Sequence, residues 1–166
     1  MKGKKFPEID FTKLIIPPVE LKIVRRNDVF MVFDPLRRNY YVLTPEEFIR
    51  QIFVKWMIND LGYPSSVMAN EIGIKLNDTY RRCDTVVFST SGNPLMIIEY
   101  KAPGIEITQD TFNQIVRYNM QLKAKYLVVS NGIRNYCCKI DYERETYDFI
   151  RVIPTYRDAI GMPGIN

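Results

Sequence analysis

The chain has 166 residues, of which 46% are hydrophobic, and this suits one domain of ordinary size with a substantial core. It contains no histidine and only three cysteines, which excludes histidine triads, Cys/His zinc sites and a disulfide framework. The net charge of +4 and a pI near 8.9 are compatible with a phosphate-bearing partner. Because neither a signal peptide nor a membrane-length apolar run is found, we expect a cytoplasmic protein.

The N-terminal part of the chain differs in composition from the rest. Residues 1–20 are rich in lysine and proline, and we expect them to form an extended arm of a single domain that spans residues 1–166. Alternating apolar residues around a turn predict a β-hairpin over 29–43. A short strand is expected at 72–76.

A helix is predicted to follow the first hairpin. Thr44 is a good N-cap and Pro45 a good first helical residue, and Glu47 completes a capping box. The neighbouring Glu46 is spaced to pair with Arg50 one turn later. The helix is expected to end near Gly62, which is a suitable C-cap.

A second hairpin carries the residues of greatest chemical interest. Two β-branched and aromatic runs flank the turn Thr90–Asn93, and they predict antiparallel strands that contain Asp84 in one and Glu99 and Lys101 in the other. If Thr90–Asn93 is the loop, Asp84 lies directly opposite Glu99, with Cβ atoms about 4.5–5.5 Å apart. Lys101 then projects from the same face as Glu99.

Two interpretations of this arrangement are open. Glu99 and Lys101 are spaced as an ordinary ion pair at a solvated strand edge, which would carry little energy. However, one lysine does not neutralise two acids, and partly buried charges need partners. A divalent cation such as Mg2+, which prefers carboxylate oxygens, would relieve the repulsion between Asp84 and Glu99.

The remaining elements predict an α/β architecture. A helix is expected to start at Thr108 or Thr111 and to run to about Leu122, and a continuous apolar strand follows at 126–130. A helix between two buried strands predicts a crossover to a parallel neighbour. With outer strands at 135–140 and 147–150, the sum is a mixed β-sheet flanked by helices.

Several motifs resemble a known family. The pattern of Asp84 followed by Glu99-Tyr100-Lys101 resembles the PD-(D/E)xK nuclease superfamily, with Cys83 where that pattern has proline. Three surrounding groups of residues resemble the N-terminal nuclease domain of type I restriction enzyme R (motor) subunits, and these are 44–51 with 62–64, 99–103 with 111–118, and 126–132. The resemblance covers about residues 30–150.

The resemblance implies a restriction-endonuclease-like fold and a Mg2+-dependent endonuclease acting on DNA, with Mn2+ as a substitute metal. Its metal ligands would be Asp84, Glu99 and the Tyr100 carbonyl, and Lys101 would orient or deprotonate water or stabilise the transition-state charge. Gln114 and Tyr118, one helical turn apart, would contact the nucleic-acid backbone, or they are simply the flank of an amphipathic helix. Glu47 is either a further ligand or only a helix cap.

The resemblance also bears on partners. The 166 residues contain no Gly-x-x-x-x-Gly-Lys-Ser/Thr loop and therefore carry no ATP-driven motor of their own, so motor, specificity and methyltransferase subunits are expected partners. Two alternatives stay open at this point. One is a non-catalytic DNA-binding or assembly module of a restriction complex, and the other is a repair or RNA-processing nuclease on the same fold.

Overall fold

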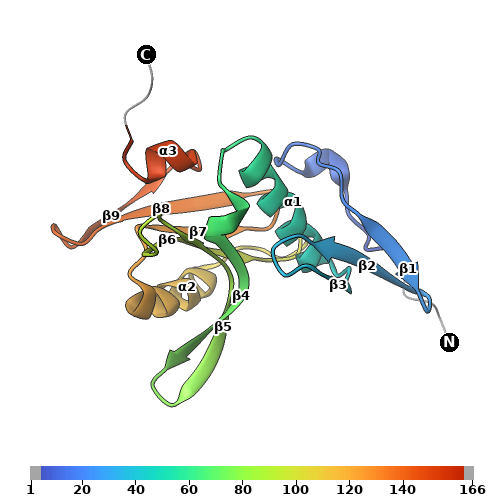
Figure 1. Ribbon diagram of the computed structural model, residues 1–166, viewed down its shortest axis with the longest axis horizontal. Helices are drawn as coiled ribbons and strands as arrows, with labels where there is room; N and C mark the ends of the chain where they lie inside the picture. The colour runs from blue at the N-terminus through green and yellow to red at the C-terminus, as the bar shows by residue number, and fades with distance from the viewer. Residues whose placement is uncertain (1–4, 163–166) are drawn as a thin grey trace.

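The computed structural model describes residues 5–162 and contains two β-sheets (Figure 1). The smaller sheet is antiparallel, and its three strands are β1 (Ile23–Arg26), β2 (Val29–Asp34) and β3 (Asn39–Val42). The larger sheet has six strands in chain order, which are β4 (Met68–Leu76), β5 (Thr79–Phe88), β6 (Pro94–Tyr100), β7 (Tyr126–Ser130), β8 (Asn135–Asp141) and β9 (Thr146–Ile150).

The larger sheet is mixed. Strands β6 and β7 are parallel, and every other neighbouring pair in this sheet is antiparallel. The parallel pair is joined by the helix α2 (Gln109–Leu122), as expected for a crossover connection. The predicted α/β class, a mixed sheet flanked by helices, is therefore confirmed.

The two main helices cover opposite faces of the larger sheet. Helix α1 (Pro45–Asn59) packs over one face, where its Phe53 meets Met96 and Tyr100 of β6 in the larger core. Helix α2 covers the other face and places Ile115 against Ile97. From Met96 onward, the apolar residues of β6 alternate between the two cores, because successive side chains of a strand point to opposite faces. Each fully buried aliphatic side chain stabilises the fold by roughly 1.5–3 kcal/mol.

Strands β4 and β5 exchange faces part-way along their length. The pair Met68 and Val87 lies in the α1-side core, whereas the pair Ile72 and Cys83 lies against the α2-side core. Residues of a regular strand that are separated by an even number share a face. The exchange occurs at Glu71, which has a φ of 58°. The far half of the β4–β5 hairpin is thereby turned toward α2, and Figure 1 shows it extending beyond the rest of the sheet.

The element predictions are confirmed in part. Both hairpins form, and α2 begins after Thr108 as expected, but residues 29–43 belong to the separate three-stranded sheet. The strand expected at 72–76 is the second half of the longer β4. The C-cap of α1 is Asp60 rather than Gly62, which instead supplies a φ of 72° in the following turn.

Sequence reasoning did not predict two small elements, β1 and the short helix α3 (Tyr156–Ala159). The arm expected at 1–20 lies partly outside the described residues. From residue 5 onward it contains one 3-10 turn, Phe11–Lys13, and it packs Ile16 into the α1-side core. No helix in the described range 5–162 is long and apolar enough to cross a membrane.

Candidate active site

The β5–β6 hairpin brings the two predicted acids together. Its register pairs Thr85 with Ile98 and Val87 with Met96, which is the predicted register, and a bulge follows between Val87 and Phe88. Continued by one residue, the same register places Asp84 opposite Glu99. The regular ladder ends there, because the backbone N–H of Tyr100 donates to Oδ2 of Asp84 at 2.8 Å.

Glu99 is buried but only half paired. Its Oε1 accepts a hydrogen bond from Nε2 of Gln114 at 3.1 Å and lies 3.6 Å from Nζ of Lys101. Its Oε2 is buried and has no hydrogen-bond partner. Burial, followed by the negative charge of Asp84, raises the pKa of Glu99 to about 8, and the positive charge of Lys101 works against the rise. Glu99 therefore has one oxygen without a hydrogen-bond partner, and its ionised form is disfavoured.

Asp84 is as deeply placed but is fully paired. Its Oδ1 accepts from Nη2 of Arg50 at 3.0 Å, and Oδ2 is held by the Tyr100 N–H. Burial raises the pKa of Asp84, while the positive charge of Arg50 opposes that rise. Arg50 is thus the cation that compensates this acid within the chain.

Arg50 connects several acids beneath the site. Its Nη1 donates to Glu47 at 2.7 Å, and its Nη2 lies 2.6 Å from Glu71 as well as close to Asp84. The left-handed backbone at Glu71 is what turns that carboxylate from the strand toward Arg50. A guanidinium offers several donors in one plane, and this suits it to bridging carboxylates.

A second arginine extends the network to the smaller sheet. Arg37 donates to Oε1 of Glu47 at 2.6 Å and forms a short ion pair with the buried Asp34. Asp34 also accepts a hydrogen bond from Asn70 of β4 at 2.8 Å. Burial raises the pKa of Asp34, but its hydrogen bonds with Asn70 and Arg37 outweigh burial and lower the pKa below the ordinary value. Acids and arginines therefore alternate from the β2–β3 turn to Asp84, and they fasten α1 between the two sheets.

The two acids in the first turn of α1 have different surroundings. Glu47 accepts hydrogen bonds from Arg37, Arg50 and also Gln51, so both of its oxygens are occupied. Thr44 does cap the helix by accepting from the Glu47 N–H at 3.0 Å, but the Glu47 side chain turns inward to the arginines. Arg50 pairs with Glu47 at i, i+3, and not with Glu46 at i, i+4 as expected.

Glu46 interacts electrostatically with charged groups of the hairpin. Burial raises its pKa, and the next largest influences are the negative charge of Asp84, which raises it, and the positive charge of Lys101, which lowers it. The negative charge of Glu46 in turn raises the pKa of Glu99. The structure therefore brings Glu46, rather than Glu47, into the electrostatic field of the predicted site.

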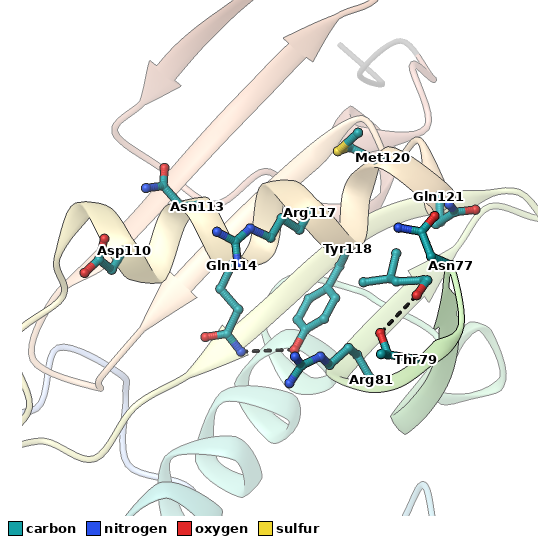
Figure 2. Close-up of a pocket in the computed structure, with 11 residues that line it drawn as sticks. Asn77, Thr79, Arg81, Asp110, Asn113, Gln114, Arg117, Tyr118, Met120 and Gln121 are labelled. Carbon is teal, nitrogen blue, oxygen red and sulfur yellow. Dashed lines mark hydrogen bonds between the residues drawn. The ribbon is translucent and has the colours of Figure 1, made fainter.

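Gln114 and Tyr118 of α2 reach the site together. Nε2 of Gln114 donates to the Tyr118 hydroxyl at 3.0 Å (Figure 2). The same Nε2 also donates to Glu99, so the pair lies beside the acid. Tyr100, by contrast, points its side chain into the α1-side core and shares a 3.0 Å hydrogen bond with Thr85. The use of its carbonyl as a metal ligand stays a prediction.

Sequence reasoning missed three residues of this site, namely Arg50 as a partner of Asp84, Glu71 and Arg37. No motif marks them, since each is brought in by tertiary packing. In residues 5–162 no cluster of three or more His, Cys, Asp or Glu side chains has the arrangement of a complete metal site. The unpartnered oxygen of Glu99, beside the second acid Asp84, does fit a hard cation that takes one or two carboxylates and completes its shell with water.

Residues 45–154 match the family described as the type I restriction enzyme R protein N terminus (HSDR_N). The chain belongs to this family. This membership agrees with the resemblance found in the motifs.

Two further comparisons accompany the family match. A solved structure described as a fragment of an HsdR subunit of a type I restriction enzyme from Vibrio vulnificus YJ016 is 16% identical, with a TM-score of 0.44. The match covers 61% of this chain and 22% of that fragment, so this R-subunit domain corresponds to less than a quarter of the fragment. A search of curated proteins gave no match.

Proposed function

We propose that this domain hydrolyses phosphodiester bonds of DNA with Mg2+, or Mn2+ as a substitute, in the manner of a PD-(D/E)xK nuclease. Asp84 and Glu99 would hold the metal, with the Tyr100 carbonyl as a further ligand. A bound cation would lower the pKa of a water molecule and neutralise charge on the phosphate oxygens. The family context makes other restriction-enzyme subunits the proposed partners.

The single observation that carries the proposal is the state of Glu99. A buried carboxylate with an unpartnered oxygen is costly unless a cation completes its surroundings. Its pKa of about 8 records this cost, because the charged form is disfavoured when only the protein surrounds it. A cation beside Glu99 would favour the charged form and would remove the penalty.

Lys101 supplies positive charge at the mouth of the site. Its ammonium lies 3.6 Å from Oε1 of Glu99, and its side chain retains 24% exposure. It can therefore reach a phosphate oxygen from solvent while its stem stays fixed by β6. A positive group placed where negative charge develops stabilises the transition state. Lys101 could also orient the attacking water.

Gln114 and Tyr118 act at the other side of Glu99. The Gln114 amide holds Oε1 of Glu99 and leaves Oε2 as the unpartnered oxygen. The Tyr118 hydroxyl accepts from the same amide and keeps its own hydrogen free to donate to a phosphate oxygen. We assign both residues to backbone contact near the scissile phosphate. As an additional acid from α1, Glu46 is better placed than Glu47, whose oxygens the arginines occupy.

A cleavage assay with matched variants tests the proposal. Plasmid and linear DNA would be incubated with the purified chain and a titration of Mg2+ or Mn2+. Glu99→Gln and Lys101→Ala are each expected to lower the rate by about 100-fold or more. Lys139→Ala, which removes an exposed lysine of β8, serves as the control and should leave the rate unchanged. Full activity of Glu99→Gln would refute the site.

One observation favours a second candidate, a non-catalytic DNA-binding or assembly module. Arg50 already compensates Asp84, so this acid does not require a metal. Calorimetric titration of Mg2+ into the parent and into Asp84→Ala separates the two functions. Metal binding that disappears in the variant supports the nuclease. DNA binding without any metal binding or cleavage in the parent supports the module.

A further inference from the structure

A polar cleft lies between α2 and the far half of the β4–β5 hairpin. Its volume is about 640 Å3, and Figure 2 shows side chains entering it from both walls. The main polar groups are Asn77, Thr79 and Arg81 on the hairpin and Asn113, Gln114 and Arg117 on the helix. The face exchange at Glu71 forms this cleft, because it turns the far half of the hairpin toward α2.

The cleft shares a residue with the surroundings of Glu99. Gln114 and Tyr118 line its wall, and the same Gln114 amide donates to Glu99. A ligand that fills the cleft therefore touches the two residues that flank the candidate active site. A chain molecule lying along the cleft would continue toward Glu99 and Lys101.

The charge of the cleft selects an anionic ligand. Arg81 lines the cleft from the hairpin and Arg117 lines it from α2, and both are exposed (Figure 2). Within residues 5–162 neither forms an ion pair, and Asp110 is the one acid in the lining. Two unpaired guanidinium groups among neutral amides and hydroxyls are suited to phosphates, which arginine binds through paired donors.

The size of the cleft selects a single strand. Its volume falls within the range of about 300–1,000 Å3 that is typical of pockets for drug-sized ligands, which corresponds to about one or two nucleotides. A duplex is too wide to enter between a helix and a hairpin that pack side by side. Proteins that bind single strands use such positively charged grooves to follow the backbone.

We infer that this cleft binds the phosphate backbone of a single DNA strand, with Arg81 and Arg117 as the phosphate contacts, and guides it to Glu99. The inference rests on the proposed function for the choice of DNA. It adds two residues and a strand path to the site, and it assigns a role to the far half of the hairpin. Arg81 and Arg117 are positioning residues, since neither lies at Glu99.

Binding measured without metal tests this inference separately from cleavage. Fluorescence anisotropy in EDTA would follow a labelled DNA strand of about 15 nucleotides, the matching duplex, and an RNA strand of the same sequence. The test variant is Arg81→Ala/Arg117→Ala. The matched control is Arg82→Ala/Arg144→Ala, which removes the same charge from two exposed positions that do not line the cleft.

The test variant is expected to bind the DNA strand at least about 10-fold more weakly, and its dependence of log K on log salt should be shallower by about 1 to 2. The control should lose much less than the test variant. Equal losses in test and control, or tighter binding of the duplex, would overturn the cleft assignment. Tighter binding of RNA than of DNA would overturn the choice of DNA.

Two further results separate this inference from the proposed function. Glu99→Gln should abolish cleavage while it binds the DNA strand as the parent does in EDTA. If the parent never cleaves but the arginine variants lose binding, the cleft assignment stands and the nuclease proposal fails. If the parent cleaves and the test variant binds like the parent, the cleft assignment fails alone.

Discussion

Asp84 and Glu99 are neighbouring acids of comparable burial, but the chain treats them differently. Asp84 is 9% exposed and both of its oxygens are held, one by Arg50 and the other by the Tyr100 N–H. Glu99 is 5% exposed and leaves one oxygen without any partner. The paired side of the site, formed by Asp84 and Arg50 of α1, is thus neutralised within the chain. The incomplete side, formed by Glu99 next to α2, keeps one oxygen without a partner. The paired oxygens of Asp84 suit a residue that holds the fold, and the unpartnered oxygen of Glu99 supports the proposed cation site.

The largest expected effect comes from removing the cation on the paired side. Arg50→Met would leave the buried Glu47 and Asp84 and the half-buried Glu71 without their shared counter-ion, and the free energy of unfolding should fall by about 3–5 kcal/mol. Urea unfolding monitored by circular dichroism measures this change. Arg82→Met is the control, since Arg82 is 76% exposed and lies 3.6 Å from the same Glu71.

The control should change the free energy of unfolding by less than about 1 kcal/mol. If Arg50→Met were equally mild, the network beneath Asp84 would not hold the fold. Asp84 and Glu99 would then differ in their hydrogen bonds but not in their contribution to stability.

The incomplete side should respond to metal. If Mg2+ binds at Glu99 and Asp84, a concentration 100-fold above Kd stabilises the parent by about 2.7 kcal/mol. Thermal unfolding with increasing Mg2+ measures the gain as a rise in Tm. Glu99→Gln should abolish the rise, whereas Glu143→Gln, a change at an exposed acid in the β8–β9 turn, should retain it. A rise that persists in Glu99→Gln would place the ion elsewhere.

The same acid should make metal-free stability depend on pH. The pKa of Glu99 is raised to about 8 in the folded chain from an ordinary value near 4.5, so between these values the folded state binds more protons than the unfolded state. Stability in EDTA should therefore fall as pH rises from 5 to 8 and should then level off. Burial raises the pKa of Asp84 as well, which adds to the same trend.

Urea unfolding at pH 5.5 and pH 8.5 measures this slope. In the parent we expect a loss of more than about 1 kcal/mol, because each unit of pKa shift corresponds to about 1.4 kcal/mol. Glu99→Gln should flatten the slope, since the amide does not titrate. A parent that gains stability over the same interval would contradict the description of Glu99 as a carboxyl group with a penalised charge.

Local chemistry allowed much of the site to be predicted. The turn residues after Phe88 determine the hairpin register that brings Asp84 to Glu99, and helical spacing alone places Gln114 beside Tyr118. Both relations connect residues that are close in sequence or belong to one element. The sequence is therefore sufficient where a single period, of two or of 3.6 residues, decides the outcome.

The rest of the site depends on packing between elements. Glu46 and Glu47 differ by about 100° around α1, and which of them faces the hairpin is decided by how the helix is rotated against the sheet. The face exchange at Glu71 requires a left-handed backbone at a residue other than glycine, for which the sequence carries no signal. The role of Arg50 as the partner of Asp84 and Glu71 depends on both the rotation of α1 and the face exchange at Glu71.

The smallest expected effect concerns how the two helices begin. Thr44 caps α1 with its side chain, which accepts from the Glu47 N–H, whereas Thr108 at the start of α2 makes no such bond. Thr44→Ala should therefore lower the free energy of unfolding by about 1 kcal/mol, and Thr108→Ala by clearly less. Urea unfolding measures both changes, and Thr44→Ser should restore most of the loss because serine offers the same acceptor. Equal losses in the two alanine variants would mean that the side-chain cap of Thr44 does not stabilise α1. The position of α1 would then depend on its arginine contacts and not on its cap.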